Sequence, residues 1–169
     1  IVNEGDISIA DYGLAAFVAP GVRNAGTITA RMGSVALASG NAFTLDLYGD
    51  DLIHLMVGDE ILDDVVDVAS GETVTDLVKN EGRINADGGT VALKAATARR
   101  AVNSVVNNSG VIEAKTVGMR AGKIVLGGQT AATKTAGAPI QKVKASGQLL
   151  ATNIPVPTPR PDTAGGGHI

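Results

Sequence analysis

The stretch that decides the fold runs from Asn80 to Leu93 and reads NEGRINADGGTVAL. It consists of two phrases that the chain repeats in the same order. Copies of the first, Asn-x-Gly-x-Ile-x-Ala, lie at residues 24–30 and 108–114, with a looser copy at 3–10 and a decayed one at 146–151. Copies of the second, Gly-x-Val-x-Leu, lie at residues 33–37 and 122–126, with a variant at 13–17. The chain is therefore an internal repeat.

Each phrase has the pattern of a short strand with alternating apolar side chains, such as Ile28 and Ala30 or Val35 and Leu37. The glycine that precedes the apolar residues of each phrase is expected to take the positive φ of a sharp corner. Two such strands form one turn of a solenoid, and the turns must stack in parallel because no single turn buries its apolar face. The sequence thus predicts an all-β fold, a parallel β-helix with short helical or loop excursions.

The corner positions of this repeat are the residues to which we assign a structural role. They are Asn24, Gly26, Asn80, Gly82, Gly89, Asn108, Gly110 and Gly122. Asparagines stacked in register before the corner glycines are expected to hydrogen-bond from turn to turn and to satisfy the corner backbone.

The composition fits a narrow core of stacked strands. The chain is 44% apolar but has only two Phe, two Tyr and no Trp, so its apolar side chains are mainly small or β-branched. The absence of cysteine excludes a disulfide framework and a thiol nucleophile. No apolar run reaches the roughly 20 residues that a membrane-spanning helix needs.

The charges are unevenly distributed along the chain, although the net charge is only −3. Residues 46–76 carry ten acidic and no basic residues, whereas residues 79–144 carry eleven basic and three acidic ones. The basic segment has no aromatic residues on which bases would stack. We therefore expect solvated strand faces and no nucleic-acid partner.

Two segments depart from the repeat, and the last residues differ in composition. Residues 59–68 have early acids and apolar pairs at helical spacing, which favours a short helix or a covering excursion over the alternative of an irregular outer strand. Residues 95–103 have high helix propensity and predict one or two helical turns. Residues 1–151 are expected to form the solenoid domain, and the Pro- and Gly-rich residues 152–169 an extended linker or tail.

A few residues are candidates for chemistry. Asp46, Asp50 and Asp51 surround one turn and offer carboxylates for calcium or acid–base work, but Gly-Asp-Asp is ordinary turn composition and no Arg or Lys accompanies it. His54 lies alone on an apolar strand and His168 lies in a glycine-rich tail. We expect no catalytic residue, no metal ion and no cofactor.

Several phrases resemble the filamentous haemagglutinin family, the large exoproteins of two-partner secretion in Gram-negative bacteria. They are residues 17–20 (FVAP), 24–30, 33–41 and 105–114, within a similarity that covers about residues 1–128. The resemblance implies a right-handed parallel β-helix exported through an outer-membrane secretion transporter. It also implies a place outside the cell, secreted or on the bacterial surface. An Asn-Pro-Asn-Gly phrase, usual in the family's secretion domain, does not occur, so we expect a segment downstream of that domain.

The function expected from the repeat and the resemblance is adhesion without catalysis, as a rigid stalk or an adhesive surface that contacts a receptor or glycan on a host or neighbouring cell. The alternatives are a carbohydrate-active β-helix enzyme and a self-assembling structural fibre subunit. Few residues precede the phrase at Asn3, so the first turn is expected to expose an open edge and to drive end-to-end self-association, head to head.

Overall fold

The computed structural model describes residues 1–40, 42–46, 54–58, 64–96, 103–128 and 142–152, with the backbone alone described in 42–46 and 54–58. This part of the chain is all-β, and none of its described segments is a helix. It contains no helix long and apolar enough to cross a membrane.

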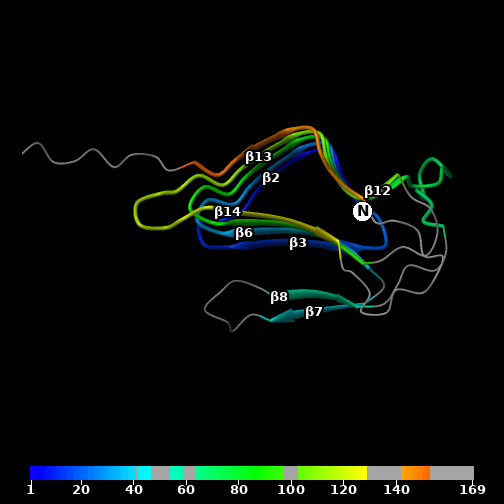
Figure 1. Cartoon of the computed structure of the whole chain (residues 1–169), viewed down its shortest axis with the longest axis horizontal. Helices are drawn as coiled ribbons and strands as arrows, with labels where there is room; N and C mark the ends of the chain where they lie inside the picture. Colours follow the sequence, from blue (N-terminus) through cyan, green and yellow to red (C-terminus); the bar gives the residue numbers. More distant parts are fainter. Residues whose placement is uncertain (41, 47–53, 59–63, 97–102, 129–141, 153–169) are drawn as a thin grey trace, which may run out of the picture.

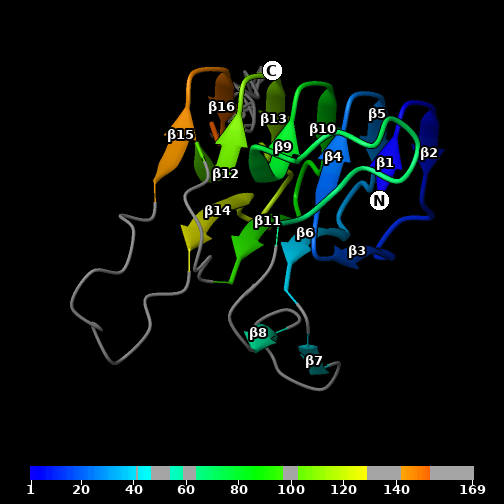
Figure 2. The same cartoon turned by 90° about the vertical axis from the view of Figure 1, so that its right-hand side faces the viewer.

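Three parallel sheets make up most of the described chain (Figures 1 and 2). Sheet A has the order β1 (Val2–Asn3), β4 (Val22–Asn24), β9 (Asp76–Asn80), β12 (Ser104–Asn108), β15 (Val143–Ala145). Sheet B has the order β2 (Asp6–Ser8), β5 (Thr27–Thr29), β10 (Arg83–Asn85), β13 (Val111–Glu113), β16 (Gln148–Leu150). Sheet C has the order β3 (Leu14–Ala19), β6 (Ser34–Ser39), β11 (Thr90–Ala95), β14 (Lys123–Gly128).

The chain passes through sheets A, B and C in turn and then starts again, and one such passage is a rung. Rungs 1 to 4 are β1–β3, β4–β6, β9–β11 and β12–β14, and the described part of rung 5 is β15 and β16. The sequence predicted two strands for each repeat, whereas a complete rung has three. The third strand lies before each corner, and in rungs 2 to 4 it contains a Val-x-Asn phrase, as at 78–80 and 106–108, which pair with each other.

The register of the strands aligns equivalent residues of successive rungs. In sheet B, Ile7 lies beside Ile28, Ile28 beside Ile84, and Ile84 beside Ile112. In sheet C, Val91 and Leu93 point inward and are 0% exposed, whereas the alternate residues Thr90, Ala92 and Lys94 are partly exposed. The core is therefore a set of side-chain columns that run through the rungs.

The corner glycines between sheets A and B serve a different purpose from the one predicted. Positive φ angles in the described chain occur at other residues, among them Tyr12 (64°) and Met32 (53°), which precede the glycines of the second phrase. At Gly82, an added Cβ would collide with the carbonyl oxygen of Gly26 in the previous rung, and Gly110 stands in the same relation to Gly82. The glycine is needed because the backbones of successive rungs approach too closely for a side chain.

The insertion between rungs 2 and 3 adds an antiparallel hairpin and an excursion. The hairpin pairs β7 (Ala42–Asp46) with β8 (His54–Gly58), and β8 lies beside β6, whose residues are buried on both faces. The excursion, residues 64–75, is closed by an antiparallel bridge between Val66 and Thr73.

The helix predicted over residues 59–68 is wrong where the structure describes it. Residues 64–68 are not helical, and the Asp67 carboxylate accepts a hydrogen bond from the Ala69 amide (2.8 Å), a local bond that competes with a helix. The alternative, a covering excursion, agrees with the packing of Val65 against the core. Of the helix predicted over 95–103, residues 97–102 lie outside the described part, and Ala95 is the last residue of β11.

Candidate functional site

The outer face of sheet A carries a row of polar side chains. The register places Arg23 beside Lys79, Lys79 beside Asn107, and Asn107 beside Lys144. The valines that precede them in rungs 2 to 4, such as Val78, point inward and are buried. Strand alternation therefore presents one polar residue to the outside in each of rungs 2 to 5.

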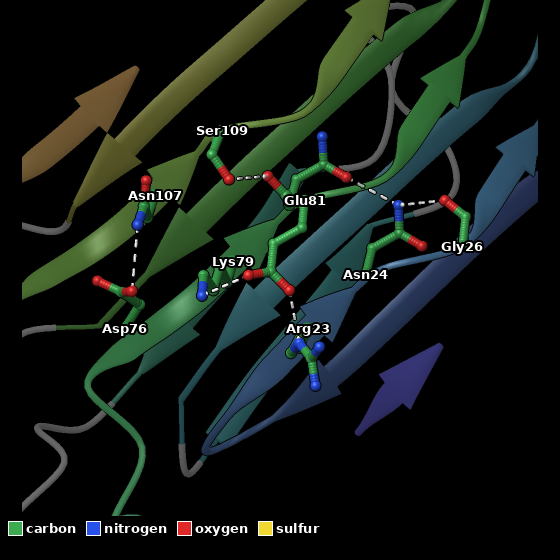
Figure 3. A network of polar contacts seen from close by, with 9 residues as sticks. Arg23, Asn24, Gly26, Asp76, Lys79, Glu81, Asn107 and Ser109 are labelled. Atoms are coloured by element: carbon green, nitrogen blue, oxygen red, sulfur yellow. Dashed lines mark hydrogen bonds and ion pairs between the residues drawn. The ribbon is translucent and has the colours of Figure 1, made fainter. Parts of the chain in front are cut away.

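Glu81, at the corner after β9, binds two of these cations (Figure 3). Its carboxylate accepts from Lys79 Nζ at 2.5 Å and from Arg23 Nε of the preceding rung at 2.7 Å. The hydrogen bond from Lys79, and then that from Arg23, lower the pKa of Glu81 below its ordinary value. The bond to Glu81 raises the pKa of Arg23. Because these side chains are 30–43% exposed, water screens the pairs, and each contributes at most about 1 kcal/mol.

An asparagine ladder lies just inside the same sheet. Asn3 donates its amide to Asn24, Asn24 to Asn80, and Asn80 to Asn108, each at 2.7 Å between Nδ2 and Oδ1. The amides of the last three also reach the carbonyl oxygen of the glycine two residues on, at 3.3–3.5 Å. From Asn24 onward these side chains are fully buried, so the ladder satisfies polar groups that would otherwise be costly.

A second buried polar group begins β9. Asp76 is 8% exposed, and its carboxylate accepts hydrogen bonds from Ser104 Oγ and from Asn107 Nδ2, the latter at 3.1 Å. Both donors come from the next rung, as Figure 3 shows for Asn107. Asp76 is thus held between rungs by neutral donors.

A groove of about 650 Å³ lies between the excursion 64–75 and the outer face of rungs 1 to 3. Its sheet side includes Arg23, Lys79 and Glu81, and its excursion side includes Val66 and Val68. Val68 is 99% exposed. The groove therefore combines an ion-paired wall with a mixed wall on which Val68 is an exposed apolar side chain.

Two further contacts between rungs lie away from the groove. Glu113 on sheet B accepts from Arg83 of the preceding rung at 3.1 Å and lies 3.7 Å from Lys115. At the corner between sheets B and C, the guanidinium of Arg120 stacks over the ring of Tyr12, 4.9 Å from its centroid. Exposed charges on these faces thus link one rung to another.

The predicted corner residues fall into two groups. Asn24, Gly26, Asn80, Gly82, Asn108 and Gly110 lie together at the corner between sheets A and B. Gly89 and Gly122 lie at the corner between sheets B and C, where Gly89 stacks on Gly33. Gly122 differs because it follows a small hairpin, bridged between Val117 and Arg120, and approaches the Ala114 carbonyl of its own rung.

The residues considered for chemistry are described only in part. Asp50, Asp51 and His168 lie outside the described residues, and Asp46 and His54 lie in strands whose side chains are not described. Within the described residues, no group of three His, Cys, Asp or Glu side chains is placed to hold a metal ion.

No protein-family model, no curated protein and no solved structure matches the chain.

Sequence reasoning did not find the groove or the bonds of Asp76. A signal for the ion pairs exists, since aligning the Val-x-Asn phrases places Arg23 and Lys79 in one column, next to Glu81 at the corner. The groove has no comparable signal. The excursion that forms one wall lies between repeats and aligns with nothing else in the chain.

Proposed function

We propose that this chain is a segment of a filamentous-haemagglutinin-like exoprotein and forms a right-handed parallel β-helix. In this proposal it is exported through an outer-membrane transporter and acts in adhesion at or beyond the cell surface, as a stalk or adhesive surface without catalysis. The phrases that resemble the family support export and adhesion. The right hand follows from the strong preference of parallel strands for right-handed crossovers, about 98% of cases.

The observation that carries the proposal is the regular joining of one rung to the next. Backbone pairing, the apolar columns and the asparagine ladder all continue from rung to rung in one register. Ion pairs on the outer faces, such as Arg23 with Glu81 and Arg83 with Glu113, add further links. A stack joined in this way is stiff along its axis, which is what a stalk requires.

The contact surface in this proposal is the groove beside the excursion. Arg23, Lys79 and Glu81 offer hydrogen-bond donors and acceptors, and Val68 offers an exposed apolar side chain across from them. Sugar rings present both hydroxyl groups and apolar C–H faces, so this combination fits a glycan on a neighbouring cell surface.

The experiment measures retention of beads coated with the 169-residue chain on a panel of immobilised glycans and cell surfaces. Val68→Asp should reduce retention severalfold, because it places a charge where the groove now exposes an apolar side chain. Met119→Asp is the matched control, since Met119 is as exposed as Val68 but lies at the other corner. Equal loss in both variants, or no retention of the unmodified chain on any surface, would count against the groove.

The same panel tests the absence of catalysis. Soluble polysaccharides incubated with the chain should release no reducing sugar and develop no absorbance from unsaturated uronates. Robust turnover of any of these polysaccharides would contradict the non-catalytic proposal and favour a carbohydrate-active enzyme.

A further inference from the structure

The walls of the groove carry more carboxylates than cations. The described side chains that line it include four carboxylates and two cations, namely Asp67, Glu72, Asp76, Glu81, Arg23 and Lys79. This excess has the same sign as the carboxylate or sulfate group of an acidic glycan. The charges that line the groove therefore bear on which glycans can enter it.

Both cations of the groove are already balanced. Glu81 accepts from Lys79 Nζ at 2.5 Å and from Arg23 Nε at 2.7 Å (Figure 3). The hydrogen bond to Glu81 raises the pKa of Arg23 most, and the negative charges of Glu81, Glu4 and Asp67 raise it further. Arg23 thus lies among carboxylates, and an acidic ligand would have to compete with Glu81 for both cations.

The carboxylates of Asp76 and Asp67, in contrast, are held by neutral donors. Asp76 accepts from Ser104 Oγ and, at 3.1 Å, from Asn107 Nδ2 (Figure 3). Asp67 accepts from the backbone amide of Ala69 at 2.8 Å. None of these donors carries a charge, and Asp76 is only 8% exposed, so water and salt screen it weakly. The negative charge of these side chains therefore acts on whatever occupies the groove.

Glu72 adds a further negative charge on the excursion side of the groove. It is exposed, and its carboxylate forms no ion pair with any described residue. Ser70, Thr73 and Thr75 also line this side and offer hydroxyl groups, which both donate and accept hydrogen bonds. The excursion, residues 64–75, thus presents hydrogen-bonding groups and no Lys or Arg.

Sugar hydroxyls and acidic groups differ in how they interact with such walls. A hydroxyl donates a hydrogen bond to a carboxylate, and a carboxylate offers about four acceptor sites, of which Asp76 uses two. A sugar carboxylate or sulfate has only acceptor atoms, so it meets the carboxylates of the groove without a donor and with the same charge. The apolar C–H face of either kind of sugar can lie on Val68.

We propose that the groove takes uncharged glycans and excludes glycans whose bound sugar carries a carboxylate or sulfate group. Hydroxyl groups of the bound sugar donate to Asp76 and Glu72, while Arg23 and Lys79 keep their bonds to Glu81. The proposal rests on the adhesive function proposed above, because it names the class of glycan that the same groove takes.

Retention on matched pairs of glycans tests the proposal. The two members of a pair differ only in acidic groups: a galactoside with or without a terminal sialic acid, a polygalacturonan with free or methyl-esterified carboxylates, and a dextran with or without sulfate. Beads coated with the 169-residue chain should be retained at least about tenfold better on the uncharged member.

The outcomes of this comparison separate the selectivity from adhesion itself. Equal or stronger retention on the acidic member, lost in Val68→Asp, would overturn the selectivity while the groove remains the contact surface. No retention on any pair would overturn the adhesive function, and the selectivity with it.

Ionic strength separates charge repulsion from a poor fit. Raising the salt concentration from about 0.01 M to about 1 M shortens the screening distance from about 30 Å to about 3 Å. Retention on the acidic member should therefore rise, whereas retention on the uncharged member should stay within about twofold. A fall on the acidic member would show that Arg23 and Lys79 attract it, and no change would show that charge does not exclude it. Either result would contradict the proposal.

Two substitutions should relax the exclusion of acidic glycans. Glu72→Lys reverses a charge on the groove wall. Glu81→Gln removes the partner of Arg23 and Lys79. Each should raise the ratio of acidic to uncharged retention by about tenfold. Asp6→Lys is the matched control for Glu72→Lys, because Asp6 is exposed on β2, outside the groove, and the net charge changes equally. An equal rise in Asp6→Lys, or an unchanged ratio in Glu72→Lys, would show that the charges of the groove do not select the glycan.

Discussion

At the scale of the residue, the sequence predicted the role of the repeated asparagines but not that of the repeated glycines. Their positions could be read from the repeated phrase, and the stacking of Asn24, Asn80 and Asn108 follows from equal spacing before each corner. The reason for the glycines could not be read in this way. Whether a corner needs positive φ or a missing side chain depends on how closely the next rung approaches, which is a distance between residues far apart in sequence.

Gly82→Ala should therefore destabilise the protein by about 3 kcal/mol, because the added methyl group meets backbone that no side-chain movement can clear. Gly127→Ala is the matched control, since a Cβ there has open space around it. Urea denaturation of both variants measures the difference. Equal free energies of unfolding would show that the rungs can separate at the corner.

Asn80→Ala should cost about 2–3 kcal/mol, because it leaves one N–H of the buried Asn24 amide without its acceptor and the side-chain oxygen of Asn108 without its donor. Asn3→Ala should cost less, since Asn3 is only partly buried and bonds to one neighbour in the ladder. Thermal denaturation of the two variants side by side provides the comparison. If both substitutions lowered stability by the same amount, the contribution of each asparagine would not depend on its burial.

At the scale of the element, the strands of the repeat could be predicted and the insertions could not. Alternation of apolar residues identified the strands of sheets B and C, but the strands of sheet A lack such alternation, since β9 reads DLVKN with two adjacent apolar residues and β4 reads VRN with one. The predicted helix does not form over residues 64–68, because the Asp67 side chain bonds locally and the neighbouring Val66 forms an antiparallel bridge with Thr73. The Asp67 hydrogen bond and the Val66–Thr73 bridge depend on how the excursion lies on the sheet, which the local sequence pattern does not reveal.

The pairing of strands β4 and β9 through Arg23, Lys79 and Glu81 should depend on pH. Because the pKa of Glu81 is lower in the folded chain than in the unfolded one, its contribution to stability is present above the unfolded value, 4.5, and is lost as the pH falls through the folded value. Glu81→Gln should lower stability at pH 7 by up to about 1 kcal/mol and make no difference at strongly acidic pH. Melting curves of both proteins across the acidic range measure this, and a constant gap between them would contradict it.

At the scale of the whole molecule, the number and order of the rungs could be predicted because each rung carries one copy of the phrase. The groove could not, since it lies between an insertion and a sheet. The columns of side chains also make the rungs depend on one another, because each rung buries its apolar face only against its neighbours.

Val91→Asp tests this dependence in the middle of the stack. Val91 is 0% exposed and lies between Val35 and Ile124 in its column, so a carboxylate there has no partner and should unfold the chain as a whole. Ala92→Asp, the next residue and outward-facing, should have a much smaller effect. Circular dichroism distinguishes the two. A native β spectrum for Val91→Asp would show that the other rungs stay folded when one rung is disrupted.

The connections between the sheets differ in length in a way that has a practical consequence. From sheet A to sheet B, two residues separate the strands in all five rungs. From sheet C back to sheet A, the gap is two residues after β3, eight after β11, fourteen after β14 and thirty-six after β6, while the register stays the same. The connection from sheet C to sheet A thus tolerates insertions of up to at least thirty-six residues. A reporter domain or an epitope inserted after Ala19, where the natural connection is shortest, should be accommodated at the side of the sheets without disturbing the side-chain columns.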